Sequence, residues 1–295
     1  MKKIIATIVM MAAFAGSAFT QTPDKSKIKK GFDDLGTSFA SALPQVTGMQ
    51  NIYADAFIGK IFPTAIPHFG AGINASLIKV DTSALNDIFD ELSLSADGVN
   101  NSMYLPSASA DIRVGGVLLP FDVGFVFLKT PSINISDISL GFTTFGVDVR
   151  YAILEDGLVT PGLSVGLGYL YNGLEFDYSS HGAKVSYDIG VHSIYTTVQV
   201  SKNIVVVTPF AGARFMVSSQ NVDWSWDLGT GNAATRDSGS CSSDGYDFGN
   251  LQTQLYAGCG LNLVVFQATF TVMADVAHAG DSKVFSGALS FRFKM

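Results

Sequence analysis

The stretch FSGALSFRFKM, residues 285–295, alternates between two kinds of side chain up to its last residue. Successive side chains of a β-strand point to opposite faces. One face carries Phe285, Gly287, Leu289, Phe291, Phe293 and Met295, and the other carries Ser286, Ala288, Ser290, Arg292 and Lys294. Chain ends usually fray into water. A terminal strand this apolar therefore predicts a strand that faces lipid and closes a transmembrane β-barrel.

The first twenty residues predict export. Lys2 and Lys3 precede an apolar stretch, 4–15, that is shorter than the ~20 residues of a membrane-spanning helix. Small residues follow around Ala18, which suits cleavage by a signal peptidase. We therefore interpret residues 1–20 as a secretory signal peptide. The lack of a cysteine near this site disfavours a lipid anchor.

Composition favours a membrane barrel over a soluble domain. Loss of Lys2 and Lys3 moves the formal net charge from −7 to −9, and so acidic a chain is a poor binder of nucleic acid. Charged residues make up 15% of the chain, below the ~25% of soluble domains. The apolar residues are spread over short alternating runs rather than one long segment, which is the pattern of barrel strands.

Turn signals divide the rest of the chain into short and long connections. Short breaks fall near 62–67, 119–120, 155–157, 202–203 and 262–264, and between them lie connections that include the long stretches 80–106 and 219–247. Outer-membrane barrels have short turns in the periplasm and longer loops outside. The candidate strands are 51–61, 66–79, 107–118, 121–130, 137–154, 158–178, 184–201, 204–219, 247–262, 265–278 and 283–294.

Eleven candidates do not fit the even strand number of bacterial barrels. We expect an all-β, transmembrane, antiparallel up-and-down barrel of about 12 strands over residues 49–295. If 51–61 is not a strand, the count is 10. Three of the candidates, 137–154, 158–178 and 184–201, exceed the ~9–11 residues needed to cross and are expected to project above the membrane.

Two helices are expected outside the strands. Within residues 21–48, apolar side chains at helical spacing predict a helix over 28–43 that is a possible lumen plug; they are Ile28, Phe32, Leu35, Phe39 and Leu43. A second helix, capped by Asp81 or Thr82, is a possible lid over the barrel mouth. Its apolar stripe consists of Leu85, Ile88, Phe89 and Leu92.

The polar faces of the strands predict a charged lumen. The charged candidates are Asp111, Arg113, Asp122, Asp148, Arg150, Asp188, Arg214, Asp275 and Arg292. They either line a selective water-filled path or form a lattice of ion pairs that fills the barrel. Phase slips at 142–145 and 191–194 predict β-bulges.

Five apolar residues are also expected to face the lumen, where they pack or line a path for hydrophobic molecules; they are Leu170, Phe210, Met216, Tyr256 and Met273. An aromatic girdle at the lipid interface is expected from Trp224, Trp226, Tyr169, Tyr171, Tyr178 and Tyr187. The alternative for the tryptophan pair is stacking on a ligand.

Nothing in the sequence indicates an enzyme, a metal site or a cofactor. His278, beside Asp281 and Ser282, is the only histidine grouped with residue types suited to hydrolysis, and a rim histidine in a tight turn explains it more simply. His192 is expected to face the lumen. Cys241 and Cys259 either pair as a disulfide or stay apart, with Cys259 on the lipid-facing side of its strand.

The last strand resembles the C-terminal signature by which the bacterial outer-membrane assembly machinery recognises its substrates. The resemblance assigns that signal to Phe285, Leu289, Phe291 and Phe293, although such barrels most often end in Phe and this chain ends in Lys294-Met295. It implies the outer membrane of a diderm bacterium, with membrane lipid and the assembly machinery as partners. The helix ahead of the strands resembles the organisation of fatty-acid-transporter-like barrels, without their Asn-Pro-Ala motif.

These expectations lead to three functions. The first is porin-like transport, the passage of a small-molecule solute through a narrow charged lumen. The second is transport of hydrophobic molecules past an N-terminal plug. The third is a closed barrel with a structural or surface-contact role.

Overall fold

The computed structural model describes residues 24–59, 68–91, 101–116, 119–130, 132–135, 138–180, 183–227, 236–243, 245–246, 248, 251–276 and 285–295. The expected signal peptide, His181, His278, Asp281 and Ser282 lie outside these residues.

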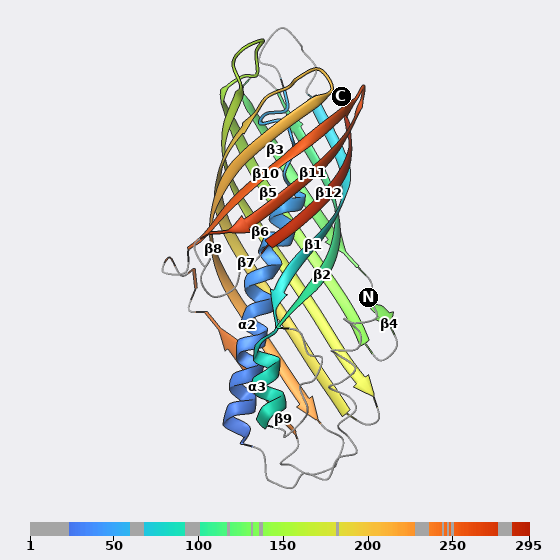
Figure 1. The fold of residues 1–295 in the computed structure, drawn as a ribbon, viewed down its shortest axis with the longest axis vertical. Helices are drawn as coiled ribbons and strands as arrows, with labels where there is room; N and C mark the ends of the chain where they lie inside the picture. Colours follow the sequence, from blue (N-terminus) through green and yellow to red (C-terminus); the bar gives the residue numbers. More distant parts are fainter. Residues whose placement is uncertain are drawn as a thin grey trace.

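Ten antiparallel strands form a closed barrel (Figure 1). They are β1 (His68–Asp81), β2 (Ser102–Gly115), β3 (Phe121–Lys129), β5 (Ile138–Leu154), β6 (Gly162–Ser180), β7 (Ala183–Ser201), β8 (Val207–Asp227), β10 (Gln252–Leu263), β11 (Phe266–Asp275) and β12 (Phe285–Lys294). Each pairs with the next, and β12 closes on β1 while β8 pairs with β10. The expected fold class is confirmed, with the alternative count of ten in the barrel.

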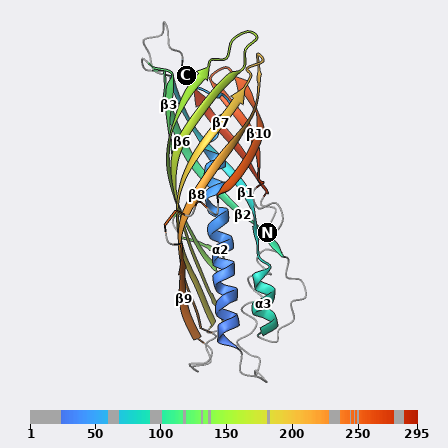
Figure 2. The same ribbon diagram turned by 90° about the vertical axis from the view of Figure 1, so that its left-hand side faces the viewer.

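Two further strands belong to the same sheet but lie outside the barrel. β4 (Ile133–Ile135) pairs with the start of β5, and β9 (Arg236–Ser242) pairs with the end of β8. Both fall in stretches predicted as loops. Strands β5 to β8 contain 17, 19, 19 and 21 residues, so they extend past the barrel as an open wall, visible in the lower half of Figures 1 and 2. The predicted projection of long strands is confirmed.

The helix α2 (Lys25–Gln50) runs along this wall and ends inside the barrel (Figure 2). Asp24 caps its start, because the Asp24 carboxylate accepts a 2.9 Å hydrogen bond from the Ser26 backbone N–H. The helix is longer than the predicted 28–43. After it, the described residues 51–59 form no strand, so the expected strand 51–61 is wrong over this part: the barrel encloses the segment instead.

A second helix, α3 (Ala84–Glu91), lies where the sequence predicts one. The Asp81 carboxylate accepts a 2.8 Å hydrogen bond from the Ser83 backbone N–H just ahead of it. Ile88 packs against Gly31 of α2, so α3 lies beside α2 (Figure 2). The predicted stripe residue Leu92 lies outside the described residues.

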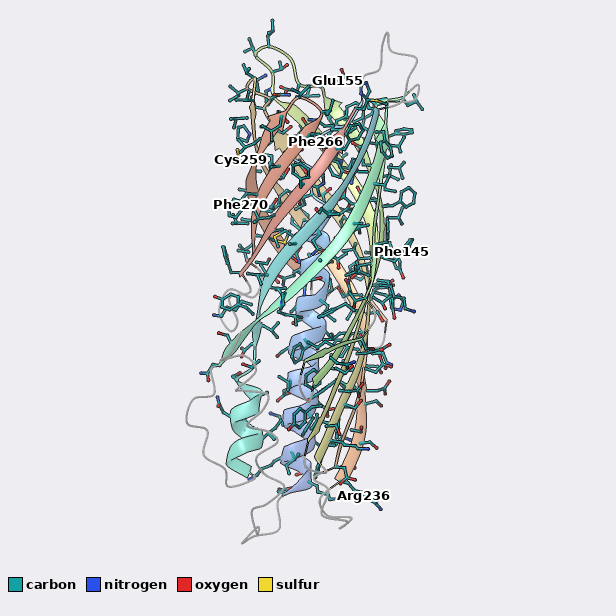
Figure 3. All side chains as sticks on the ribbon, turned by 90° about the vertical axis from the view of Figure 1, so that its right-hand side faces the viewer. Phe145, Glu155, Arg236, Cys259, Phe266 and Phe270 are labelled. Carbon is teal, nitrogen blue, oxygen red and sulfur yellow. The ribbon has the colours of Figure 1, made fainter. Side chains whose placement is uncertain are left out.

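The apolar face of the barrel strands points outward. Phe145 of β5 and Phe270 of β11 project outward on opposite flanks of the barrel in Figure 3. On β12, Phe285, Leu289 and Phe291 are about half exposed or more, while Ser286, Ser290 and Arg292 are buried. The facing predicted from the terminal alternation is therefore correct.

The wall strands change their apolar side at one level, without a bulge. On β7, Ile189 and Val191 are buried against α2, whereas Ile194 and Val198 point outward. The β6–β7 register is continuous from Gly162 to Ser180, and β5–β6 is regular across Phe142–Phe145. Both predicted bulges are wrong. The sequence pattern shifts because the apolar side faces lipid within the membrane and faces a helix beyond it.

Beyond that level the wall, α2 and α3 enclose an apolar core. Phe32 of α2 stacks on Trp224, Tyr187 and Trp226, with ring centroids 5.2, 5.8 and 6.4 Å away. The tryptophans and Tyr187 are therefore buried, as is Tyr178, and the prediction that they form a lipid-interface girdle is wrong.

Tyr169 and Tyr171 instead lie on the outer face, at the level where the apolar side changes. The Tyr169 hydroxyl lies 2.7 Å from His192 Nδ1, and the Tyr171 ring lies 4.9 Å from the His192 ring. His192 is exposed on the same outer face. Its predicted lumen position is wrong, because the register of β7 never shifts.

Replacing Phe291 by Asp is expected to reduce assembly into lipid vesicles. A carboxylate on the lipid face near a membrane interface costs up to about 1 kcal/mol, and the phenyl group is lost as well. The matched change Ser290→Asp places the carboxylate on the lumen side. Quantifying the membrane-inserted fraction of both variants is the measurement, and equal losses would contradict the facing of β12.

Candidate functional site: the plugged lumen

The plug consists of α2 and the segment 51–59 that follows it. Three arginines on the inner face of the barrel bind its backbone. Arg214 donates a 2.5 Å hydrogen bond to the Gly48 carbonyl, and Arg292 donates a 2.6 Å bond to the Gln50 carbonyl. Both carbonyls belong to the last turn of α2, where unsatisfied carbonyls give a helix its negative end. Arg150 donates a 3.0 Å bond to the Asp55 carbonyl further along. These three lumen arginines are thus bound to the plug itself.

Four buried charges form an ion-pair network on the inner face of β2, β3 and β5. Arg113 donates to Asp122 at 2.5 Å and to Asp148 at 2.7 Å, and Arg150 donates to Asp122 at 2.6 Å. All four side chains are at most 5% exposed. Asp122 also accepts a 2.8 Å bond from the Ile58 backbone N–H. The carboxylate of Asp122 therefore joins two guanidinium groups to the plug.

A second network lies around Tyr53 of the plug. The Tyr53 hydroxyl donates to Asp111, and Arg292 donates to both oxygens of Asp111 at 3.2 Å. The Tyr53 ring lies under two guanidinium groups, 4.1 Å from that of Arg292 and 5.1 Å from that of Arg113. Asn74 completes the network by donating to Asp111 at 2.6 Å.

Further hydrogen bonds fix the segment that follows α2. Gln199 donates to the Tyr53 carbonyl at 2.7 Å, and the Ala56 backbone N–H donates to Ser201 at 2.8 Å. Asn51 donates to Asp148, and Lys294 forms a 2.8 Å ion pair with Asp55. The backbone from 51 to 58 is thus held inside the barrel by inward-facing side chains of the barrel strands.

Arg214 differs from the other lumen arginines. No carboxylate of the described residues pairs with it within 4 Å, and its Nε and Nη1 atoms have no hydrogen-bond partner. Its guanidinium lies 4.7 Å from the Tyr195 ring and 5.9 Å from the Tyr256 ring. A Cβ at Gly48 would overlap its Nη1 atom. Arg214 is therefore compensated mainly by the helix end, and a larger residue at position 48 would push its guanidinium group aside.

The five apolar lumen candidates face inward, as predicted, and separate into two clusters. Phe210, Tyr256 and Met273 pack with the plug residues Met49 and Ile52. Leu170 and Met216 belong to another cluster, with Val126 and Tyr195. They fill the barrel interior between the charged groups and the plug.

Eight of the nine charged candidates are buried on the inner face. They are Asp111, Arg113, Asp122, Asp148, Arg150, Arg214, Asp275 and Arg292. Asp188 is the correction: it is exposed on the outer face of the wall, with Glu175 and Asp223 as its cross-strand neighbours. The supposed bulge at 191–194 had assigned it to the lumen.

The plug was predicted only as far as residue 48, so its residues Asn51, Tyr53 and Asp55 were missed. The sequence around them, NIYADAF, alternates polar and apolar residues as a strand does. The one usable signal was the count of eleven strands, which required one candidate to be something else.

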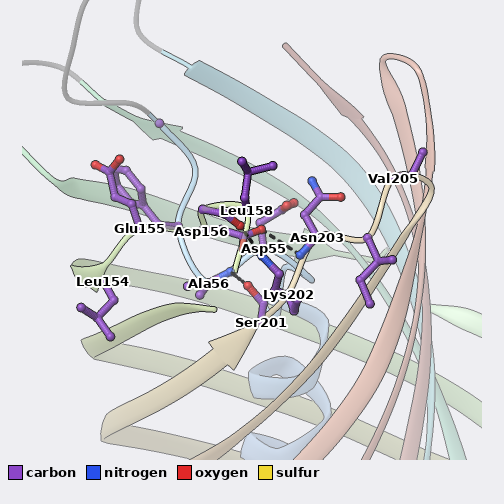
Figure 4. Close-up of a pocket in the computed structure, with 15 residues that line it drawn as sticks. Asp55, Ala56, Leu154, Glu155, Asp156, Leu158, Ser201, Lys202, Asn203 and Val205 are labelled. Carbon is purple, nitrogen blue, oxygen red and sulfur yellow. Dashed lines mark hydrogen bonds and ion pairs between the residues drawn. The ribbon is translucent and has the colours of Figure 1, made fainter. Parts of the chain in front are cut away.

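A pocket of about 650 Å³ opens at the end of the barrel where this segment leaves it (Figure 4). It lies between the segment from Asp55 to Gly59 and the turns around 155–158 and 201–205. Lys202 forms a 2.8 Å ion pair with Asp156 within it. This ion pair joins two neighbouring turns of the rim.

Other expectations concern single residues. Cys241 and Cys259 are free, and Cys259 lies on the outward side of β10 in Figure 3, so the alternative of separate cysteines is correct. Among the residues that the structure describes, no cluster of side chains is arranged to hold a metal ion. Neither α2 nor α3, the helices described, is both long and apolar enough to cross a membrane.

Comparisons with known proteins find solved structures of low identity and low TM-score. No family model and no curated protein matches the chain. Among solved structures, the translocator domain of the autotransporter NalP from Neisseria meningitidis is 11% identical, with a TM-score of 0.44 over 94% of this chain and all of that one. The outer membrane protease OmpT from Escherichia coli is 9% identical, with a TM-score of 0.40 over 77% of this chain and 93% of that one. The Ralstonia pickettii toluene transporter TbuX is 8% identical, with a TM-score of 0.24 over 79% and 90%.

Proposed function

We propose that this bacterial outer-membrane β-barrel is a plugged channel, whose charged lumen passes small solutes only when α2 and the segment after it move aside. The observation that carries the proposal is the binding of Arg214, Arg292 and Arg150 to backbone carbonyls of the plug. The same side chains that would select a solute are held by the plug at rest.

The apolar core between α2, α3 and the wall supports a barrel that is closed at rest. Ile28, Phe32, Leu35 and Leu43 of α2 are each at most 4% exposed. Burying one such side chain contributes about 1.5–3 kcal/mol, so withdrawing α2 completely costs roughly 6 kcal/mol or more. Since ~1.4 kcal/mol corresponds to a tenfold change, fewer than about one molecule in 10⁴ would be open spontaneously.

The polar side chains of the lumen support a path that water can fill. Many of the lumen's contacts with the plug are hydrogen bonds, in which Arg and Gln side chains donate and Asn and Ser side chains accept. Water can replace such partners after the plug leaves. The apolar lumen residues form two separate clusters, which gives less support to a continuous path for hydrophobic molecules.

The test uses a cross-link that the structure offers. Thr37 Oγ1 of α2 lies 3.9 Å from the thiol of Cys241 on β9, so Thr37→Cys, with Cys259→Ser, brings two sulfurs together. Burial raises the pKa of the Cys241 thiol, so oxidation is done at alkaline pH. In planar bilayers, moderate urea is expected to open the reduced protein to ion current, while the oxidised protein stays silent.

The control is Thr37→Ser treated in the same way, which must open equally with and without oxidant. Deletion of residues 24–50 is expected to give current without urea. Steady current from the oxidised protein would contradict the proposal. If the deleted protein folds and remains silent, the third function is favoured, a closed barrel that acts through its outer half.

A further inference from the structure

The plug begins at one end of the molecule and finishes at the other. Lys25 contacts the Arg236 carbonyl of β9 at the far end of the wall, and Figure 3 places Arg236 and Glu155 at opposite ends of the molecule. Ile58, in contrast, contacts Asp122 and Gly115 near the turn between β2 and β3. The chain from 25 to 58 therefore passes through the whole barrel.

The end of the molecule at which α2 begins is the one that faces the outside of the cell. At the other end lie the C-terminal strand end, where Phe69 and Met295 bond to each other, and the short turns at 155–161, 202–206 and 264–265. Short turns mark the periplasmic rim of such barrels. The wall beyond the lipid-facing level carries Glu175, Asp177 and Asp188 on its exterior, as a surface in water does.

The barrel encloses this passage on every side. All ten strand pairs are hydrogen-bonded, including β12–β1 and β8–β10. Residues from Thr47 to Ile58 contact β1, β3, β5, β6, β7, β8 and β12 through the bonds described above and through Thr47 to Asn172 and Gln50 to Ser76. The segment has no lateral exit into lipid.

The start of α2 cannot have reached the outer side through lipid. It carries four lysines within six residues, Lys25, Lys27, Lys29 and Lys30, all exposed to solvent. Charged side chains are expensive in hydrocarbon, whereas the lumen offers carboxylates and amides along its length. A chain delivered to the periplasm therefore has one favourable route outward, which is the barrel's own lumen.

We propose that the barrel is the conduit through which the chain exports its own N-terminal helix, and that it displays any flexible peptide joined to the start of α2 on the cell surface. The passage is used once, during assembly, and α2 then closes it. This activity does not depend on whether solutes pass later.

The first test locates both ends in intact cells. In a Cys241→Ser, Cys259→Ser background, Lys29→Cys marks the start of α2 and Val159→Cys, at a position 89% exposed, marks a short turn. A large polymer-linked maleimide added outside is expected to modify Lys29→Cys at least tenfold more than Val159→Cys until the outer membrane is opened. Protection of Lys29→Cys, or modification of Val159→Cys, in intact cells would overturn the proposal.

The second test asks whether the route is the lumen. A flexible epitope is inserted directly before Asp24, and a matched insert contains a small domain closed by a disulfide in the periplasm. Antibody binding to intact cells is expected at least tenfold higher for the flexible insert, and reductant during growth is expected to restore display of the other. Equal display of both without reductant would overturn the conduit. Heat-modifiable mobility on gels confirms that each barrel has folded.

Discussion

Replacing Asp122 by Asn is expected to lower the free energy of unfolding by about 3–5 kcal/mol, the usual cost of breaking a buried ion pair by removing one partner. The Asp122 carboxylate accepts hydrogen bonds from both Arg113 and Arg150 and is fully buried. Asn keeps the shape but removes the charge, so Arg150 retains no carboxylate within 4 Å among the described residues. The measurement is urea unfolding in lipid vesicles.

A matched control lies at the periplasmic rim. Asp156 forms an ion pair with Lys202 at a similar distance, 2.8 Å, but both side chains are about a quarter exposed. Exposed pairs contribute about 0–1 kcal/mol, so Asp156→Asn is expected to have little effect. Equal losses from the two substitutions would show that burial of the network at Asp122 does not set its contribution.

Replacing Phe32 by Ala is expected to cost about 3–5 kcal/mol, as deletion of a buried aromatic ring does, and to loosen the outer half of α2. The Phe32 ring stacks on Trp224, Trp226 and Tyr187. These are the only two tryptophans of the chain, so tryptophan emission reports on this core alone. The emission maximum is expected to move to longer wavelength, and α2 is expected to become sensitive to protease.

Phe266→Ala is the control for that experiment. Phe266 projects from the lipid-facing side of β11 (Figure 3) and does not belong to the apolar core that contains both tryptophans. Its replacement is expected to leave the emission unchanged. An unchanged emission in Phe32→Ala as well would contradict the packing of α2 on the wall.

Period-two alternation was enough to predict most of the candidate site. Asp111, Arg113, Asp148 and Arg150 are inward because their apolar neighbours face lipid, and the register transmits that choice along each strand. The pairing of these charges was not predictable, since it depends on which strands are neighbours and on what fills the lumen. The plug supplies several of the partners, and its sequence resembles a strand.

The errors on the wall strands have one physical cause. An apolar strand face indicates burial but not the partner, which is lipid for Ile194 and helix α2 for Val191. If lipid is the assumed partner along the whole strand, the apolar side can be kept outward only by a bulge, and the false bulge placed Asp188 in the lumen. The same assumption assigned Trp224 and Trp226 to the lipid interface.

The level at which the wall strands change their apolar side also sets a hydrophobic thickness for the protein. On β6 the outward residues from Leu163 to Tyr171 span eight steps, and at ~3.3 Å per residue and a tilt of about 40° they rise roughly 20 Å. Above this band the exterior is acidic and cannot sink into hydrocarbon. A thicker bilayer must thin around the barrel, because otherwise its hydrocarbon would cover Glu175 and Asp188. A difference between the thickness of the membrane and that of the apolar band would therefore act on the wall that packs against α2.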